Sequence, residues 1–213
     1  MKKKGTFIVF EGGEGSGKSG QAKLLAQHLR SQGHPVVLTR EPGGTPNIGT
    51  DIRNVLLDPR HHETMLPRTE LLLFLADRTD HVERVIRPAL EEGNIVICDR
   101  FTASTFAYQC FTGEACTPSE FMEMEKFARG GLTPDFTFWI DIDPRIGLER
   151  NRVNGKRDRF EGKDLSFHEK VREGFKAYFD LYKDRHRFAR IDGGPPIAEV
   201  QVQIKTRADH LVA

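Results

Sequence analysis

The stretch Thr-Phe-Ile-Val-Phe-Glu-Gly-Gly-Glu-Gly-Ser-Gly-Lys-Ser, residues 6–19, decides the fold. Its first six residues form an apolar run, rich in β-branched and aromatic side chains, that ends at glycines and indicates a buried strand. Residues 12–19 fit the pattern G-x-x-x-x-G-K-S without a gap, and a helix is predicted over 21–29. A glycine-rich turn that matches by chance is the alternative, but the flanking strand and helix count against it.

The residue types in this loop suit a phosphate cradle. Glycines let backbone N–H groups curl around phosphate oxygens, and the following helix N-terminus adds partial positive charge. Lys18 supplies a charge for the β and γ phosphates, and Ser19 offers a hydroxyl to Mg²⁺. The candidate ATP-binding residues are Gly12, Gly13, Glu14, Gly15, Ser16, Gly17, Lys18 and Ser19.

Strands and helices alternate along the rest of the chain. This pattern predicts an α/β fold of the P-loop NTPase type, with a parallel five-stranded sheet flanked by helices. Ligands in such sheets bind outside the carboxyl ends of the strands. The further strands are expected at 36–39, 94–98, 135–141 and 187–192. The further helices are expected at 64–88, ending before Pro88, and at 119–130, from Pro144, at 165–183 and at 196–212.

Composition narrows the class of protein. The 213 residues suit a single domain over 1–213 with an appendage. A formal net charge of +1 argues against a nucleic-acid coat. No apolar run approaches the roughly 20 residues of a membrane span, and the run behind the basic N-terminus is too short for a signal peptide. Three cysteines without metal-ligand spacing favour free thiols in the cytoplasm.

Two arginines follow predicted strands. One lies in Thr39-Arg-Glu-Pro-Gly-Gly-Thr45 and the other in Asp99-Arg-Phe-Thr-Ala-Ser-Thr-Phe-Ala-Tyr-Gln109. Both should reach the edge of the sheet that carries the glycine-rich loop, where a guanidinium suits bidentate contact with a second phosphate. For Asp99-Arg100 the alternative is a surface ion pair.

An ordered set of stretches resembles the thymidylate kinase family over almost the whole chain. They are residues 10–19, 39–45, 74–78 (Phe-Leu-Ala-Asp-Arg), 99–109, Pro134-Asp135 and 167–175 (Phe-His-Glu-Lys-Val-Arg-Glu-Gly-Phe). The resemblance implies an ATP-dependent phosphotransferase that converts dTMP and ATP to dTDP and ADP in dTTP synthesis. It also implies Mg²⁺ as cofactor and a homodimer.

The resemblance implies a role for each matching residue of the acceptor site. Phe74 would stack on thymine, and Arg78 would hydrogen-bond its exocyclic oxygen; a core phenylalanine with a surface arginine is the alternative. Arg100 would hold the dTMP phosphate and the reacting oxygen. Glu14 would receive the sugar 3′-hydroxyl or a Mg²⁺-bound water. The remaining candidates are Arg40 and Arg53 for the phosphate, Ser104, Thr105 and Gln109 for the base, and Tyr108 for the sugar.

A basic segment over about 150–163 has two interpretations: a solvated charged loop, or a mobile lid that closes over ATP. Because the glycine-rich loop has no base beyond Lys18, the chain resembles the members of the family that carry catalytic arginines in the lid. Arg152, Arg157 and Arg159 are the candidates for stabilising charge on the transferred phosphoryl group. Gly20 stands where the family usually has threonine.

Two other functions fit part of the pattern. A deoxynucleoside kinase acting on thymidine would need a carboxylate base, for which Glu41 is a candidate. The three arginines Arg40, Arg53 and Arg100 instead suit an acceptor that already bears a phosphate. A nucleotide-binding regulator of a partner protein is the other alternative, but the guanine-reading Asn-Lys-x-Asp motif of GTPase switches is absent.

Overall fold

The computed structural model describes residues 5–61, 64–153, 159–160 and 162–212. A parallel sheet of five strands forms its centre, in the order β2-β3-β1-β4-β5. The strands are β1 (Thr6–Glu11), β2 (Val36–Arg40), β3 (Ile95–Asp99), β4 (Phe136–Asp141) and β5 (Phe188–Asp192). The predicted α/β fold with a five-stranded parallel sheet is therefore confirmed, with strand ends that differ by at most one residue.

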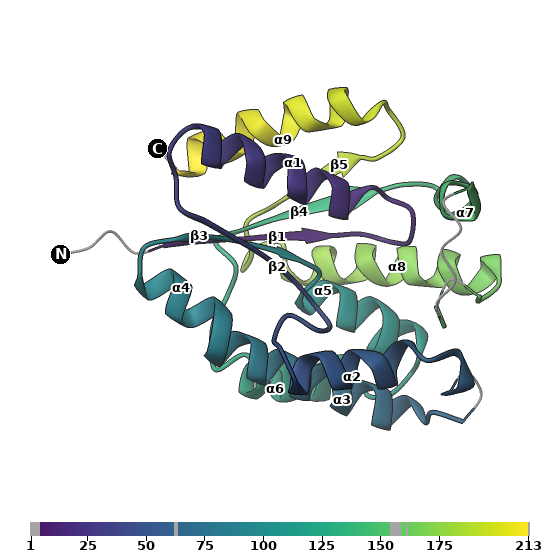
Figure 1. Cartoon of the computed structure of the whole chain (residues 1–213). Helices are drawn as coiled ribbons and strands as arrows, with labels where there is room; N and C mark the ends of the chain where they lie inside the picture. The colour runs from purple at the N-terminus through teal and green to yellow at the C-terminus, as the bar shows by residue number, and fades with distance from the viewer. Residues whose placement is uncertain (1–4, 62–63, 154–158, 161, 213) are drawn as a thin grey trace.

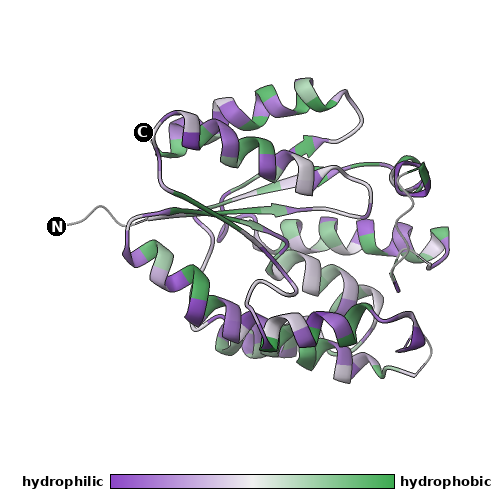
Figure 2. Cartoon of the chain, in the orientation of Figure 1, coloured by the Kyte–Doolittle hydropathy of each residue, from purple (hydrophilic) through white to green (hydrophobic). Residues whose placement is uncertain are grey.

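Side-chain alternation along β1 explains how both faces of the sheet are covered. Ile8 and Phe10 belong to one apolar cluster with α1 (Lys18–Ser31) and α9 (Ile197–Val212). Phe7 points to the opposite face and joins a second cluster. Figure 1 shows α1 and α9 together on one side of the sheet and the other large helices on the opposite side. Green, hydrophobic residues run along the strands in Figure 2, as expected of a sheet buried on both faces.

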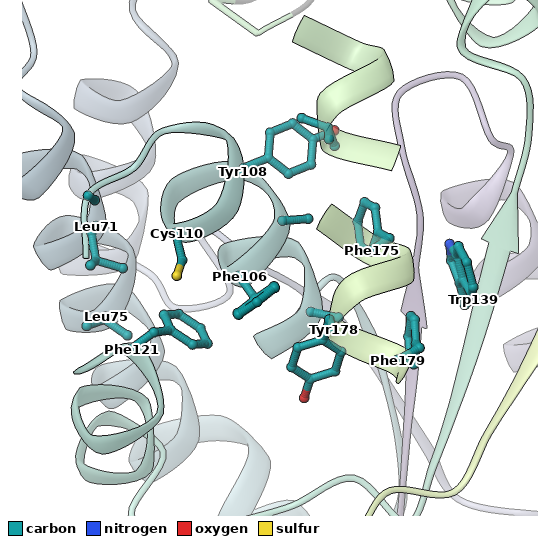
Figure 3. Close-up of a cluster of buried hydrophobic side chains, with 14 of the residues drawn as sticks. Leu71, Leu75, Phe106, Tyr108, Cys110, Phe121, Trp139, Phe175, Tyr178 and Phe179 are labelled. Atoms are coloured by element: carbon teal, nitrogen blue, oxygen red, sulfur yellow. The ribbon is translucent and has the colours of Figure 1, made fainter. Parts of the chain in front are cut away.

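The helices on the second side build the largest apolar cluster. Figure 3 shows Phe106, Phe121 and Tyr178 gathered there between helices. The elements on this side and at the carboxyl ends of the strands are α2 (Ile48–Leu57), η1 (Pro59–His61), α3 (Pro67–His81), η2 (Val82–Ile86), α4 (Arg87–Glu91), α5 (Thr102–Thr105), η3 (Phe106–Thr112), α6 (Pro118–Ala128), α7 (Pro144–Val153) and α8 (Leu165–Tyr182). In the described residues, no helix is both long and apolar enough to cross a membrane.

The end predicted for the helix that includes α3 was wrong. Helical structure continues from α3 through the π-helical η2 into α4, which ends at Glu91. Pro88 lies in the first turn of α4 rather than beyond its end. The wider turns of η2 precede this proline, so its ring and its missing N–H are accommodated without ending the helix.

Candidate active site

One large cavity opens at the carboxyl ends of the strands, with a volume of about 1320 Å³. Sites for a single small molecule occupy roughly 300–1,000 Å³, so this cavity has room for two ligands. The predicted residues that line it are Glu14, Gly15, Gly17, Lys18, Ser19, Arg40, Arg53, Phe74, Arg78, Arg100, Ser104, Thr105, Tyr108 and Gln109. Gly12, Gly13 and Ser16 complete the glycine-rich loop between β1 and α1.

The glycine-rich loop adopts a conformation that depends on its glycines. Gly15 has a φ of 65°, and a Cβ there would lie 1.9 Å from the carbonyl oxygen of Gly147 in α7. Lys18 is the first residue of α1 and is 5% exposed; its Nζ donates to the carbonyl of Gly13 at 3.1 Å. Burial, together with the charge of Arg100, lowers the pKa of Lys18. Backbone N–H groups, a helix N-terminus and a buried ammonium thus converge where an anion would bind.

Arg100 links this loop to the other end of the cavity. It has a left-handed φ of 74°, and its Nη1 donates to the Gly12 carbonyl and to Ser104 Oγ, both at 3.0 Å. Its Nη2 forms an ion pair with Glu14 Oε1, which also accepts from the Tyr108 hydroxyl at 3.0 Å. Burial raises the pKa of Glu14, but the charges of Arg100 and Lys18 outweigh it and bring the pKa to about 2. Glu14 is therefore an ionised carboxylate at neutral pH.

The predicted base-reading pair lies on one face of α3. Phe74 is half-buried and lines the cavity. Arg78 is only 1% exposed: its Nε and Nη2 donate to Glu41 Oε2 at 2.9 and 2.7 Å, and its Nη2 donates to Thr105 Oγ1 at 2.9 Å. Arg78 therefore reaches the cavity from the protein interior with most of its guanidinium already bound. Its contact with a base stays a prediction.

Glu41 is held in place from two directions. Its Oε2 binds Arg78, and its Oε1 lies 3.0 Å from Nδ1 of the fully buried His81. Burial opposes ionisation of Glu41, but the charge of Arg78 and the hydrogen bond with His81 lower its pKa. A carboxylate so engaged is a poor base, which counts against the thymidine kinase alternative. The sequence did not reveal this buried network, because its members are far apart in the chain.

Of the other predicted arginines, some line the cavity and some do not. Arg40 is exposed at the cavity edge, and Arg53 Nη1 donates to the Pro42 carbonyl at 2.7 Å. Arg152 does not line the cavity; it is 77% exposed and pairs with Glu149 on the surface of α7.

Arg159 is 4% exposed, and its Nε donates to the Leu56 carbonyl at 2.8 Å. Arg157 lies outside the described residues. The roles of these lid arginines in phosphoryl transfer, and the mobility of the lid, stay predictions.

Asp99 and Arg150 are among the cavity residues that were missed as candidates. Asp99 ends β3 and lines the cavity, and its Oδ1 is buried with no hydrogen-bond partner among the described residues. An acidic residue at the end of a buried strand was the signal for it. Arg150 of α7 also lines the cavity, where its Nη1 and Nη2 donate to the carbonyls of Gly193 and Gly194 at 2.9 and 3.1 Å. It lay in the basic segment but not among the chosen arginines.

The parallel sheet and the phosphate cradle between β1 and α1 define a P-loop nucleotide-binding protein. The sequence model of the family described as Thymidylate kinase matches residues 10–204. A curated relative named Thymidylate kinase from Pseudomonas fluorescens (strain Pf0-1) is 46% identical over 208 residues, covering 98% of this chain and 97% of the relative. One of the same name from Geobacter sulfurreducens is 48% identical over 195 residues, covering 89% of each chain. The chain belongs to the thymidylate kinase family.

Proposed function

We propose that this chain is an ATP-dependent phosphotransferase that moves the γ-phosphoryl group of ATP to the 5′-phosphate of dTMP. The products are dTDP and ADP, as a step in dTTP synthesis. The observation that supports this most directly is the continuity of one cavity, with a phosphate cradle at one end and Phe74 at the other. Between the two ends, Arg100 joins the cradle to the acceptor side through Glu14. Family membership supports the same reaction.

ATP occupies the cradle in this proposal. The backbone of residues 12–19 surrounds its phosphates, and Lys18 stands beside the β and γ phosphates. Arg150 and the loop at Gly194 also line this cavity, and in this proposal they lie beside the nucleoside of ATP. A Cβ at Gly20 would meet nothing within 4 Å, so the cavity is open at that position.

The acceptor nucleotide occupies the other end. Phe74 stacks on its base, with Thr105 and Gln109 beside it and Arg78 behind it. Tyr108 lies against the sugar, where its ring excludes a 2′-hydroxyl. Arg100 holds the phosphate, assisted by Ser104, Arg40 and Arg53.

The residues at the cradle fit a Mg²⁺ ion. The Ser19 hydroxyl and the Asp99 carboxylate line the cavity, and oxygen atoms of this kind are the ligands that Mg²⁺ prefers. The unpartnered Oδ1 of Asp99 is the observation that favours a cation there. In this proposal Ser19, with Asp99 and Glu14, would hold the ion. When bound with ATP, Mg²⁺ neutralises charge on the β and γ phosphates.

The chain's own residues position the reactants and stabilise charge. An oxygen of the dTMP phosphate, already ionised at neutral pH, forms the new P–O bond as the bond between the γ-phosphorus and the β,γ-bridging oxygen breaks. That bridging oxygen leaves with ADP, so no general base is required. Lys18 and Arg100, with lid arginines, hold the charged oxygens in line. Exclusion of water from the closed cavity limits hydrolysis of ATP.

The organisation of the protein is proposed as a single domain over residues 1–213, with its lid at about 150–163. The protein is proposed to be a cytoplasmic homodimer. The dimer is supported by apolar side chains exposed on neighbouring helices α2, α3 and α6. Among them Phe127 is 86% exposed and Leu72 is 58% exposed. The free thiols of Cys98, Cys110 and Cys116 suit a reducing compartment. Sedimentation of the wild type and of Leu72→Glu tests the dimer, which the added charge should dissociate.

A panel of acceptors tests the proposed reaction. The purified protein is mixed with ATP, Mg²⁺ and dTMP, thymidine, dCMP, dGMP or AMP, and ADP formation is followed. We expect rapid ADP formation with dTMP and little with thymidine, because Glu41 is engaged by Arg78 and His81. ADP formation with thymidine alone would support the deoxynucleoside kinase instead. Slow turnover that no acceptor stimulates would support the regulator.

A further inference from the structure

Glu70 holds residues from two distant parts of the chain with its two carboxylate oxygens. It lies on α3, one turn before Phe74, and its side chain is 13% exposed. Its Oε1 accepts a hydrogen bond from Gln109 Nε2 at 2.7 Å. Its Oε2 lies 2.6 Å from Arg159 Nη2. Gln109 lines the cavity and Glu70 does not, so any effect of Glu70 on a ligand acts through its neighbours.

This contact fixes which way the Gln109 amide points. Gln109 Nε2 is the donor and Glu70 Oε1 the acceptor, so the Gln109 NH₂ group faces Glu70. The amide's other polar atom, the carbonyl Oε1, is then the one that Gln109 can present to a cavity ligand. Gln109 is 2% exposed, so it is closely confined. A ligand at this position would therefore meet an acceptor, not a donor.

The second oxygen of Glu70 acts through Arg159 on Phe160, which forms part of the cavity wall. The Arg159 guanidinium also lies 4.4 Å from the centroid of the Phe160 ring. Phe160 lines the cavity, with its ring 5.6 Å from that of Tyr108 and 6.4 Å from that of Phe74. One carboxylate thus sets both the polar edge and an aromatic wall at the acceptor end of the cavity.

We propose that Glu70 is a positioning residue that sets the base specificity of the acceptor site. By holding the Gln109 carbonyl toward the cavity, it favours a pyrimidine whose N3 carries a hydrogen, as in thymine and uracil. Cytosine has an acceptor at N3 and would meet the Gln109 oxygen unfavourably. The inference rests on the proposed function, because it assumes that a pyrimidine monophosphate is the acceptor.

The test compares kcat/KM for dTMP with kcat/KM for dCMP in the wild type and in Glu70→Gln. Calorimetric Kd values replace the rates where turnover of dCMP is too slow. A glutamine at 70 can donate as well as accept, so the Gln109 amide can turn over. We expect the preference for dTMP over dCMP to fall by roughly 10-fold or more, the value of one hydrogen bond in such a site.

Two further variants separate positioning from stability. Arg159→Met leaves the Glu70–Gln109 contact intact, so KM for dTMP should rise while the dTMP preference stays within about 3-fold. If Glu70→Gln fails to fold because Arg159 is left unpaired, the double variant Glu70→Gln/Arg159→Met removes that charge and should still lose the preference.

Glu123→Gln, on the exposed face of α6, is the control and should match the wild type. An unchanged preference in the variants that lack Glu70 would overturn the inference. A wild type without dTMP kinase activity would instead overturn the proposed function.

Discussion

The carboxylate of Glu14 and the guanidinium of Arg100 form an ion pair, although 86 residues separate them in the chain. The pair joins the glycine-rich loop after β1 to the segment after β3. Arg100 adds a hydrogen bond to the Gly12 carbonyl of the same loop. The glycine-rich loop and the segment after β3 are therefore connected, so a change at Arg100 should affect both ends of the cavity.

Arg100→Lys should lower kcat by about 10³-fold. A lysine has no planar fork, so it cannot keep Glu14 and Gly12 while holding a phosphate. Steady-state ADP formation with ATP and dTMP gives the number. Arg87→Lys, a change in a surface pair with Glu83, is the control and should retain the wild-type rate. A loss below tenfold would show that Arg100 does not stabilise the transferred phosphoryl group.

Lys18→Met should lower kcat by about 10²–10³-fold with little change in the free energy of unfolding. The reason is that Lys18 is the buried ammonium at the cradle, and among the described residues its Nζ donates to one carbonyl, that of Gly13. Lys126→Met, on the exposed surface of α6, is the matched control. Equal rates in the two variants would contradict the placement of the γ-phosphate beside Lys18.

Arg78→Ala should lower the free energy of unfolding by about 3–5 kcal/mol, because it removes the guanidinium that pairs with the buried carboxylate of Glu41. Urea denaturation monitors this loss. Arg84→Ala removes an exposed arginine that pairs with Asp80 and should cost less than about 1 kcal/mol. If Arg78→Ala keeps wild-type stability but loses dTMP affinity, the arginine serves the ligand rather than the fold.

Asp77→Asn should stabilise the protein near neutral pH. Burial, and then the charge of Glu41, raise the pKa of Asp77 from 3.8 to about 6. Because the folded-state pKa is the higher one, the contribution of Asp77 to stability is complete below pH 3.8 and is lost as pH rises through about 6.

The stability gain of Asp77→Asn over the wild type should therefore grow between pH 4 and 6 and level off at about 3 kcal/mol, since one pKa unit corresponds to about 1.4 kcal/mol. Urea denaturation at several pH values measures this gain. Glu173→Gln, on the exposed side of α8, should show no such trend. A gain that is the same at pH 4 and pH 7 would exclude a charged, desolvated Asp77 as its cause.

The sequence predicted the strands well because each is a short apolar run that ends at a polar or glycine-rich loop. The sequence did not predict α5 and η3, and the cause is physical. Phe106, Ala107, Tyr108 and Cys110 are all buried, so this segment lacks the polar face that produces a helical period. The proline rule misplaced the end of the helix at Pro88, because a π-helical turn before it is not visible in the pattern of residues.

The site was predictable where a local motif carries it. Lys18 and Ser19 follow from the spacing of one loop, and Arg100 from its place after a strand. The pairs Arg78–Glu41 and Glu70–Arg159 could not be predicted, since they depend on how distant elements pack. Asp99 shows the intermediate case: its position was visible, but its unpartnered buried oxygen required the structure.

Simultaneous binding of two nucleotides tests the central claim most directly. Calorimetric titration of dTMP into the protein, with and without a saturating non-hydrolysable ATP analogue and Mg²⁺, gives the stoichiometry of each site. If ATP binds at the glycine-rich loop and dTMP binds beside Phe74 and Arg100 in the same cavity, one dTMP per chain should bind in both titrations. Loss of dTMP binding when the ATP analogue is bound would show that the two compete for a single site, and would contradict the account.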